Sequence, residues 1–211
     1  MQTRKGQGIE DESMQIIDDE VGPHQYGKLE WPIVRRVIHA TADFDFAGKN
    51  KIVFHKNAVM NGINALKEGC SIIVDVNGVI GGMNKQNPKD FGNKVICNIS
   101  DPDIAERAKK ENKTRAQVSM RIAASEMNGG IVTIGNAPTA LLEVIKMISE
   151  GVTKPALVIG IPVGFVSAAE SKEELQTIDV PFITNTGRKG GSSCAASIVN
   201  ALFKLSRGSR V

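Results

Sequence analysis

The sequence predicts an α/β fold with a mostly parallel sheet. Short apolar runs of about five residues alternate with amphipathic segments of ten or more along most of the chain. Within each run the apolar residues are nearly continuous, which is typical of strands that helices cover on both faces. Glycine or polar residues end every run and supply the turn into the next helix. These observations predict a three-layer sandwich, with helices on both sides of the sheet and an N-terminal helical segment before it.

The N-terminal segment is expected to be a flexible tail followed by a helix. Residues 1–8 are polar and contain glycine, so we expect them to be frayed. A single domain is expected over residues 9–211, because a chain of 211 residues is most simply one domain. Over residues 9–21 apolar side chains recur at helical spacing, and a Gly-Pro pair ends the pattern.

A second helix is expected to begin at Pro32, because proline suits the first helical turn. Arg35 and Arg36 give this helix a polar face, and the aliphatic residues around them give it an apolar one. The helix carries His39 near its end. After it, acidic and aromatic residues alternate over Asp43–Phe46, which indicates a strand or an edge segment.

From residue 57 onward the expected strands and helices alternate. Each strand is bounded by turn residues, and each helix carries a charged face or an apolar stripe. We expect helices at 57–68, 104–126, 140–149, 167–175 and 192–205, and strands at 71–76, 94–99, 130–134, 155–159 and 181–184.

Composition excludes several classes of function. Aromatic residues make up 4% of the chain, which argues against a stacking platform for single-stranded nucleic acid. The net charge of +3 is spread along the chain rather than gathered in a basic stripe, so no nucleic-acid partner is expected. No run reaches the roughly 18 apolar residues of a membrane span, and the polar start shows no signal peptide. The chain is therefore expected to be cytoplasmic, with no membrane partner.

The cysteines are read as free thiols rather than as ligands or disulfides. Cys70, Cys97 and Cys194 are far apart and form no CxxC pair, which favours a reducing compartment. Neither they nor the three histidines show the spacing of metal ligands, so no metal site is expected. Cys194 falls at the start of the last helix, where a nucleophile is conceivable, but a buried structural thiol is the favoured reading.

The functional pocket is expected beyond the carboxyl ends of the strands, where loops lead into helices. The loop Gly135–Thr139 combines a glycine turn with a proline-initiated helix, whose free N–H groups could bind an anion. A plain capped helix explains the same residues equally well. The loop Thr186–Ser193 adds Arg188 and Lys189, which suit a phosphate or carboxylate, although a solvated basic loop is the alternative. Walker and GxGxxG fingerprints are absent, which weakens a nucleotide-dependent enzyme.

His39 is the residue on which the functional question turns. It follows an apolar helical run and precedes small polar residues, whereas His24 and His55 lie in more polar stretches. An imidazole at this position is either a packed core residue or a proton-transfer group, and the local pattern leaves both open.

Motifs that follow one another along the chain resemble the precorrin-8 methylmutase (precorrin isomerase) family of cobalamin biosynthesis. The resemblance runs from about Ile9 to the final helix. The motifs are RRVIHATADF at 35–44, GNAPTAL at 135–141, PVGFV at 162–166 with AAESKE at 168–173, and GRKGGS at 187–192.

The resemblance implies a Rossmann-like homodimer that moves a ring methyl group of precorrin-8, or of its cobalt form, to the adjacent carbon. This 1,5-sigmatropic shift would give hydrogenobyrinate or cobyrinate and would need no cofactor. His39 matches the family's acid–base histidine, and Ser13 and Arg115 match its substrate-contacting serine and arginine. Further contacts with the tetrapyrrole are expected from Thr41, Asn77, Asn136, Thr139, Arg188 and Lys189.

The residues support this resemblance on separate grounds. A flat macrocycle fringed by carboxylates needs an apolar slot with several anion sites, and the strand-end loops offer such sites. Gly78, Ile161 and Cys194 depart from the common family pattern, which affects the expected shape of the pocket but not the reaction class. A non-catalytic tetrapyrrole carrier is the alternative. The sequence does not distinguish the cobalt-containing substrate from the metal-free one.

Overall fold

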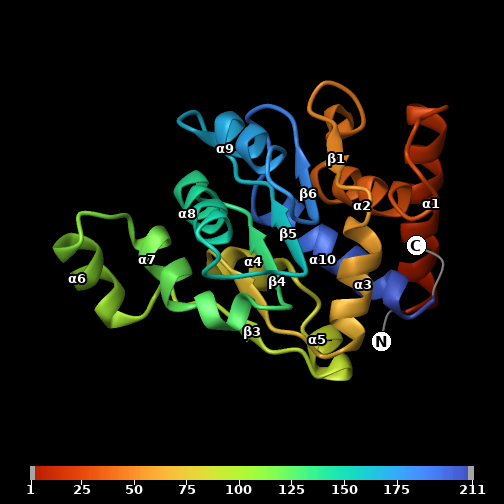
Figure 1. Cartoon of the computed structure of the whole chain (residues 1–211). Helices are drawn as coiled ribbons and strands as arrows, with labels where there is room; N and C mark the ends of the chain where they lie inside the picture. Colours follow the sequence, from red (N-terminus) through yellow and green to blue (C-terminus); the bar gives the residue numbers. More distant parts are fainter. Residues whose placement is uncertain (1–2, 209–211) are drawn as a thin grey trace.

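The computed structural model describes residues 3–208 and contains a six-stranded sheet between two layers of helices (Figure 1). The strand order is β1-β6-β5-β4-β2-β3, in which β2 to β6 run parallel and β1 pairs antiparallel with β6 at one edge. The predicted α/β class and mostly parallel sheet are therefore confirmed. The strands are β1 (Ile52–Phe54), β2 (Ile72–Val74), β3 (Val95–Ile96), β4 (Ile131–Ile134), β5 (Leu157–Gly160) and β6 (Phe182–Asn185).

The two helical layers bury opposite faces of the sheet. In β2, Ile72 and Val74 pack into one core while Ile73 packs into the other, because successive side chains of a strand point to opposite faces. One layer consists of α2 (Trp31–Thr41), α3 (Ala58–Lys67), α4 (Asn77–Gly82) and α10 (Ser192–Ser206), and the other of α7 (Arg115–Ile122), α8 (Pro138–Ser149) and α9 (Ala168–Leu175).

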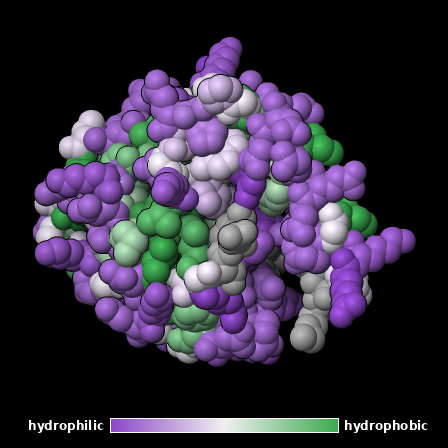
Figure 2. All heavy atoms as spheres, turned by 90° about the vertical axis from the view of Figure 1, so that its right-hand side faces the viewer, coloured by the Kyte–Doolittle hydropathy of each residue, from purple (hydrophilic) through white to green (hydrophobic). Residues whose placement is uncertain are grey.

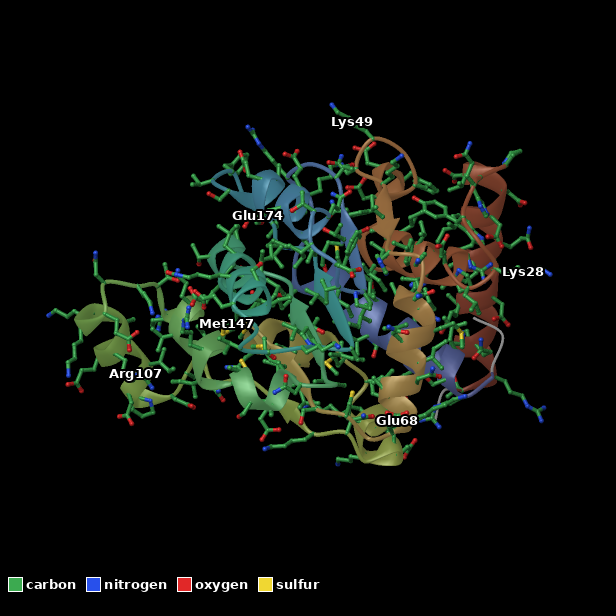
Figure 3. All side chains as sticks on the ribbon, viewed as in Figure 1. Lys28, Lys49, Glu68, Arg107, Met147 and Glu174 are labelled. Carbon is green, nitrogen blue, oxygen red and sulfur yellow. The ribbon has the colours of Figure 1, made fainter. Side chains whose placement is uncertain are left out.

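The remaining helices lie at the edges of the fold. Helix α1 (Arg4–Val21) packs on α2, α5 (Gln86–Phe91) follows α4, and α6 (Pro102–Lys110) projects from the sheet and contacts α7 (Figure 1). Met147 of α8 is fully buried, whereas Lys28, Lys49 and Arg107 lie at the periphery of the molecule in Figure 3. Within residues 3–208, no helix combines the length and the apolar character that a membrane span requires.

Ion pairs hold α1 against α2. The carboxylate of Asp18 accepts hydrogen bonds from the Arg35 guanidinium at 2.5 Å and from the Trp31 indole N–H at 2.9 Å. The next residue of α2, Arg36, pairs with Glu10 at 2.6 Å. These half-buried contacts, together with the buried Met14, place α1 alongside the end of α2 that carries His39.

The first helix begins earlier than the sequence indicated. It starts at Arg4 rather than Ile9, and the Thr3 hydroxyl caps it by accepting a hydrogen bond from the N–H of Gly6. The expectation of a frayed segment is therefore wrong for residues 4–8, while residues 1 and 2 lie outside the described part.

The single helix expected at 104–126 is wrong, because two helices, α6 and α7, separate there. Asn112 has φ +51°, a left-handed conformation that ends the first helix. Thr114 and Gln117 then form a capping box that starts the second. The pattern Thr-x-x-Gln was visible in the sequence, so this break could have been found.

The segment after His39 also differs from expectation. Phe44–Phe46 forms a short 3₁₀ turn rather than a strand, because the Asp43 carboxylate accepts a hydrogen bond from the N–H of Asp45 and caps the turn. The neighbouring edge strand is β1, which no local pattern of the sequence predicted. The helices α4 and α5, of six residues each, were not predicted either.

Candidate active site

His39 lies in the last turn of α2 and lines a pocket between α1 and α2. The pocket has a volume of about 300 Å³ and mainly apolar walls. Its lining residues are Ser13, Ile16, Ile17, Glu20, Ile38, His39, Ala42 and Phe44. The structure therefore brings two of the predicted site residues, Ser13 and His39, to one pocket.

The residues that α1 contributes to this pocket recur at helical spacing in the sequence. Residues 13, 16, 17 and 20 fall on one face of α1 because they are spaced by three and four positions. Ile16 is 49% exposed and Phe44 37% exposed, so the apolar walls remain open to solvent. On the side of the molecule that carries α1, apolar side chains gather in a patch within a largely hydrophilic surface (Figure 2).

The surroundings of His39 favour its neutral form. Partial burial lowers the pKa of the imidazole below its usual value of 6.5, and the nearby Arg36 guanidinium lowers it further. Glu10 acts in the opposite direction and raises the pKa of His39, but less strongly. In the free protein this imidazole is therefore mainly neutral at pH 7, and its charge responds readily to an added anion.

The predicted anion site at Gly135–Thr139 is occupied by a carboxylate of the protein itself. Asp75 follows β2 and is fully buried. Its two oxygens accept hydrogen bonds of 2.8 to 2.9 Å from the N–H groups of Gly135, Asn136 and Ala137. Burial raises the pKa of Asp75, although the three N–H donors oppose the rise. These three N–H groups belong to the loop before α8, whose N-cap residue Ala137 receives no side-chain cap, so Asp75 closes the loop rather than caps the helix.

Lys189 is also engaged by the protein. Its ammonium lies 2.7 Å from Asp43 and 2.7 Å from Asp45, and these hydrogen bonds raise the pKa of Lys189. The contact joins the loop after β6 to the turn that follows His39. The cation is therefore already paired with two carboxylates, rather than presented free as the sequence suggested.

Several other predicted residues make local contacts. The Thr41 hydroxyl donates to the carbonyl of Val37, one turn back in α2, at 2.8 Å. The Asn77 amide donates to the Ser100 hydroxyl at 2.9 Å, and the hydroxyls of Thr114 and Thr139 lie 3.0 Å apart. The Thr41 contact lies within α2, whereas the other two join neighbouring segments at the carboxyl edge of the sheet.

Asn136, Arg115 and Arg188 are also exposed to solvent, as are His39, Asn77 and Lys189. Within residues 3–208, neither Arg115 nor Arg188 takes part in an ion pair. The Arg188 guanidinium instead lies 5.9 Å from the ring centre of Phe165, which is 85% exposed. Both arginines are available to an anionic ligand.

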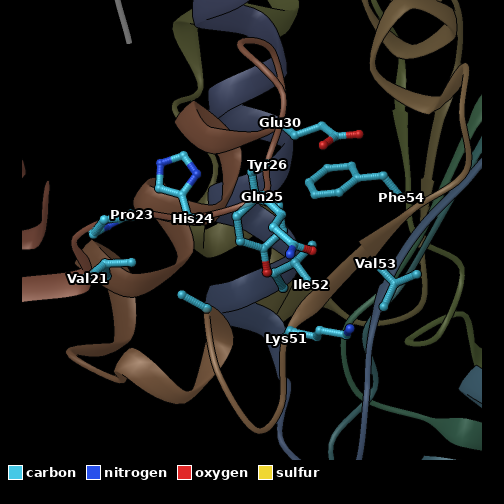
Figure 4. Close-up of a pocket in the computed structure, with 11 residues that line it drawn as sticks. Val21, Pro23, His24, Gln25, Tyr26, Glu30, Lys51, Ile52, Val53 and Phe54 are labelled. Carbon is cyan, nitrogen blue, oxygen red and sulfur yellow. The ribbon is translucent and has the colours of Figure 1, made fainter.

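A larger cavity of about 450 Å³ lies elsewhere, beside the edge strand β1 (Figure 4). The Tyr26 ring lies between His24 and Phe54 there, and the His24 ring stacks on Trp31 with 3.9 Å between ring centres. None of the predicted site residues lines this cavity. We therefore place the candidate active site in the smaller pocket of His39.

The thiols and acids supply no alternative chemistry in the described part of the chain. Burial raises the pKa of Cys194 to about 11, so a thiolate nucleophile is disfavoured at neutral pH. Within residues 3–208, no group of three or more His, Cys, Asp or Glu side chains is placed to hold a metal ion.

Comparison with known proteins gives a consistent result. The family model described as precorrin-8X methylmutase matches residues 8–205. The chain is 49% identical to the cobalt-precorrin-8 methylmutase of Leptospira interrogans, over 99% of this chain and 98% of that protein. It is 51% identical to the enzyme of the same name from Priestia megaterium, over 96% of this chain and 89% of that protein.

A solved structure has the same fold. The precorrin-8x methyl mutase from Thermus thermophilus superposes with a TM-score of 0.90 at 41% sequence identity. The match covers 98% of this chain and all of that one.

Proposed function

Because the chain belongs to the precorrin-8X methylmutase family, we propose that His39 is the acid–base group of its methyl transfer. The chain is an isomerase of cobalamin biosynthesis, which moves a methyl group within a precorrin-8 ring. The observation that supports the role of His39 is its position beside Ser13 in an open apolar pocket.

The chemistry suits a residue of this kind. In a methyl shift one carbon–carbon bond breaks as another forms on the adjacent ring carbon, so no atom is gained or lost. Protonation of the conjugated ring would favour the shift, and the proton must be taken back because substrate and product are isomers. An imidazole whose pKa lies below 6.5 can donate that proton in acid solution and accept it again readily.

The protein's main contribution would be orientation. The apolar walls of Ile16, Ile17 and Phe44 would hold the flat ring with its migrating methyl near His39. Arg115 and Arg188 would bind carboxylates at the ring's periphery, as would the loop residues Asn77, Asn136 and Thr139. Ser13 and Thr41 would contribute smaller polar contacts near His39. Lys189 would act through its ion pairs rather than by touching the ring.

A pocket of about 300 Å³ accommodates only part of a tetrapyrrole. We propose that a second copy of the chain covers the rest, in agreement with the homodimer implied by the family resemblance. The exposed apolar residues of this side, including Ile9 and Ile16, support such a contact. We also place the reaction in the cytoplasm, where the three scattered cysteines would stay reduced.

We propose cobalt-precorrin-8 as the substrate. The relatives that are 49% and 51% identical carry the cobalt name, whereas two relatives named precorrin-8X methylmutase are 35% and 38% identical and the solved structure with that name is 41% identical.

The direct test is to incubate the purified chain with cobalt-precorrin-8 and, separately, with metal-free precorrin-8. We expect a product of unchanged mass and changed absorbance, with the larger kcat/KM for the cobalt form. Substrate recovered unchanged from a tight complex would instead identify a tetrapyrrole carrier. A larger kcat/KM for the metal-free ring would reverse the substrate assignment.

A further inference from the structure

Lys172 is a fully buried lysine on α9 that the proposed reaction does not use. Its ammonium donates hydrogen bonds to the carbonyl of Gly187 at 2.9 Å and to that of Lys189 at 2.6 Å. It forms no ion pair with a carboxylate of the described residues. Burying a lysine is unfavourable unless its donors are used, and here they are used on the main chain of one loop.

That loop, residues 187–191, has a main chain that regular secondary structure does not hold. Gly187 has φ +73° and Gly191 has φ +124°, conformations that suit glycine. At Gly190, which has φ +156°, an added Cβ would lie 2.3 Å from the carbonyl oxygen of Ile161. The amide of Asn185 donates a second hydrogen bond to the Lys189 carbonyl at 2.9 Å. Side-chain donors therefore fix the main chain at Lys189.

The side chain of Lys189 leaves this loop and reaches the turn after α2. Its ammonium pairs with Asp43 and Asp45, and Asp43 also caps that turn by accepting a hydrogen bond from the N–H of Asp45 at 3.0 Å. Helix α2 ends at Thr41 and is followed by the cap residue Ala42, which has φ +52°. The place of Lys189 is thereby linked to the end of the helix that carries His39.

We propose that Lys172 is a positioning residue for the methyl transfer. By holding the main chain of the 187–191 loop, it sets the place of the Lys189 ammonium. Through Asp43 and Asp45 it thereby orients the end of α2 that carries His39. This inference rests on the proposed role of His39.

This link, the series of contacts from Lys172 through the 187–191 loop and Lys189 to Asp43 and Asp45, responds to pH. Burial lowers the pKa of Lys172 to about 8. Above that pH the neutral amine still donates to the two carbonyls, but more weakly than the ammonium does. The titratable group that faces it from α10 is Cys194, whose pKa burial raises to about 11, so this thiol stays neutral over the same range. The pKa of Lys189 is raised and that of Asp45 lowered, so both keep their charges near pH 8.

The test compares Lys172→Met and Lys189→Met with Lys67→Met, an exposed control on α3. Amide hydrogen exchange needs no substrate and follows the link directly. Lys172→Met should speed exchange both in the 187–191 loop and in the turn at 43–47. Lys189→Met removes the exposed ammonium that joins the loop to this turn, so it should speed exchange at 43–47. Faster exchange confined to the 187–191 loop in Lys172→Met would overturn the proposal.

Kinetics provide the second readout. Lys172→Met and Lys189→Met should each lower kcat by about 10- to 100-fold with little change in KM, because a misplaced catalytic group costs rate. The double variant should lose little more than either single one, since both changes cut the same link. Wild-type kcat should show a further fall above about pH 8, beyond the decline that deprotonation of His39 causes at lower pH, and Lys172→Met should lack that further fall. Additive losses in the double variant, or a further fall above pH 8 that persists in Lys172→Met, would contradict the proposal. If the wild type has no activity, the proposed function fails, while the exchange result still decides the link.

Discussion

Two regions of this molecule use polar side chains in opposite ways. At the carboxyl edge of the sheet, the carboxylate of Asp75 and the ammonium of Lys189 are satisfied by other groups of the protein. In the pocket between α1 and α2, His39 is exposed and surrounded mainly by apolar residues. The first region stabilises the fold, and the second presents a group whose charge can change.

The difference shows how a rule about parallel sheets must be applied. The rule places ligands beyond the carboxyl ends of the strands, and most of the predicted site residues lie there. A loop rich in N–H groups or cations is available to a ligand only where the protein has not already paired those groups. Arg115 and Arg188 remain available in this sense, whereas Lys189 does not.

The largest expected effect separates the His39 pocket from the larger cavity beside β1. His39→Ala should fold normally and lose about 10²- to 10⁴-fold in kcat, the usual contribution of a general acid or base. His24→Ala, in the larger cavity, is the matched control and should keep wild-type kcat. Steady-state kinetics with cobalt-precorrin-8 check both variants. The reverse result would move the site to the cavity of Figure 4.

Asp75→Ala tests the structural role of the carboxyl edge. One buried and two partly buried N–H groups would lose their acceptor, so the free energy of unfolding should fall by about 3 kcal/mol. Urea unfolding measures this change, with Asp75→Asn as the conservative control that keeps one amide oxygen. The loss in kcat should be smaller than for His39→Ala. An unchanged unfolding midpoint in Asp75→Ala would contradict the assigned role.

Arg188→Ala tests whether the exposed cations bind the substrate. Removing the exposed charge of Arg188 should raise KM about three- to tenfold and leave kcat nearly unchanged. An ion pair between an exposed arginine and a carboxylate contributes only modestly to the free energy of binding. Arg107→Ala on the projecting helix α6 is the control. Equal KM values in both variants would remove Arg188 from the binding surface.

The smallest effect is expected for Ser13→Ala. The Ser13 hydroxyl already donates a hydrogen bond to the Ile9 carbonyl at 2.8 Å. A hydrogen bond from this hydroxyl to the substrate would therefore compete with the one to Ile9. We expect kcat/KM to fall about two- to fivefold, within the range of a single neutral hydrogen bond. Ser149→Ala at the end of α8 should have no effect. A loss as large as that of His39→Ala would give Ser13 a direct part in the chemistry.

The sequence predicted the elements that long apolar runs specify. The parallel strands and helices such as α8 and α10 appear near the expected residues, because their burial pattern is local. Strand β1 has three residues and is defined by its pairing with β6, which no local pattern reveals. The break between α6 and α7 was missed although the Thr114 capping box marks it.

The site was predictable only in part, for a similar reason. The family resemblance predicted His39 and Ser13 as site residues, and the two line one pocket. The contact of Lys189 with Asp43 joins residues 146 positions apart, and that of Asp75 with the Gly135 N–H joins residues 60 apart. Such pairs depend on the tertiary fold, so the sequence alone could not show that these groups were already paired.

The most direct test of the central claim is an NMR titration of the His39 imidazole, assigned with His39→Gln, with and without the corrinoid product. In the free protein its pKa should lie below 6.5, because burial and Arg36 favour the neutral form. With product bound the pKa of His39 should rise, since the ring's carboxylates favour the charged form. A pKa at or above 6.5 that product leaves unchanged would contradict the assignment of His39 to the active site.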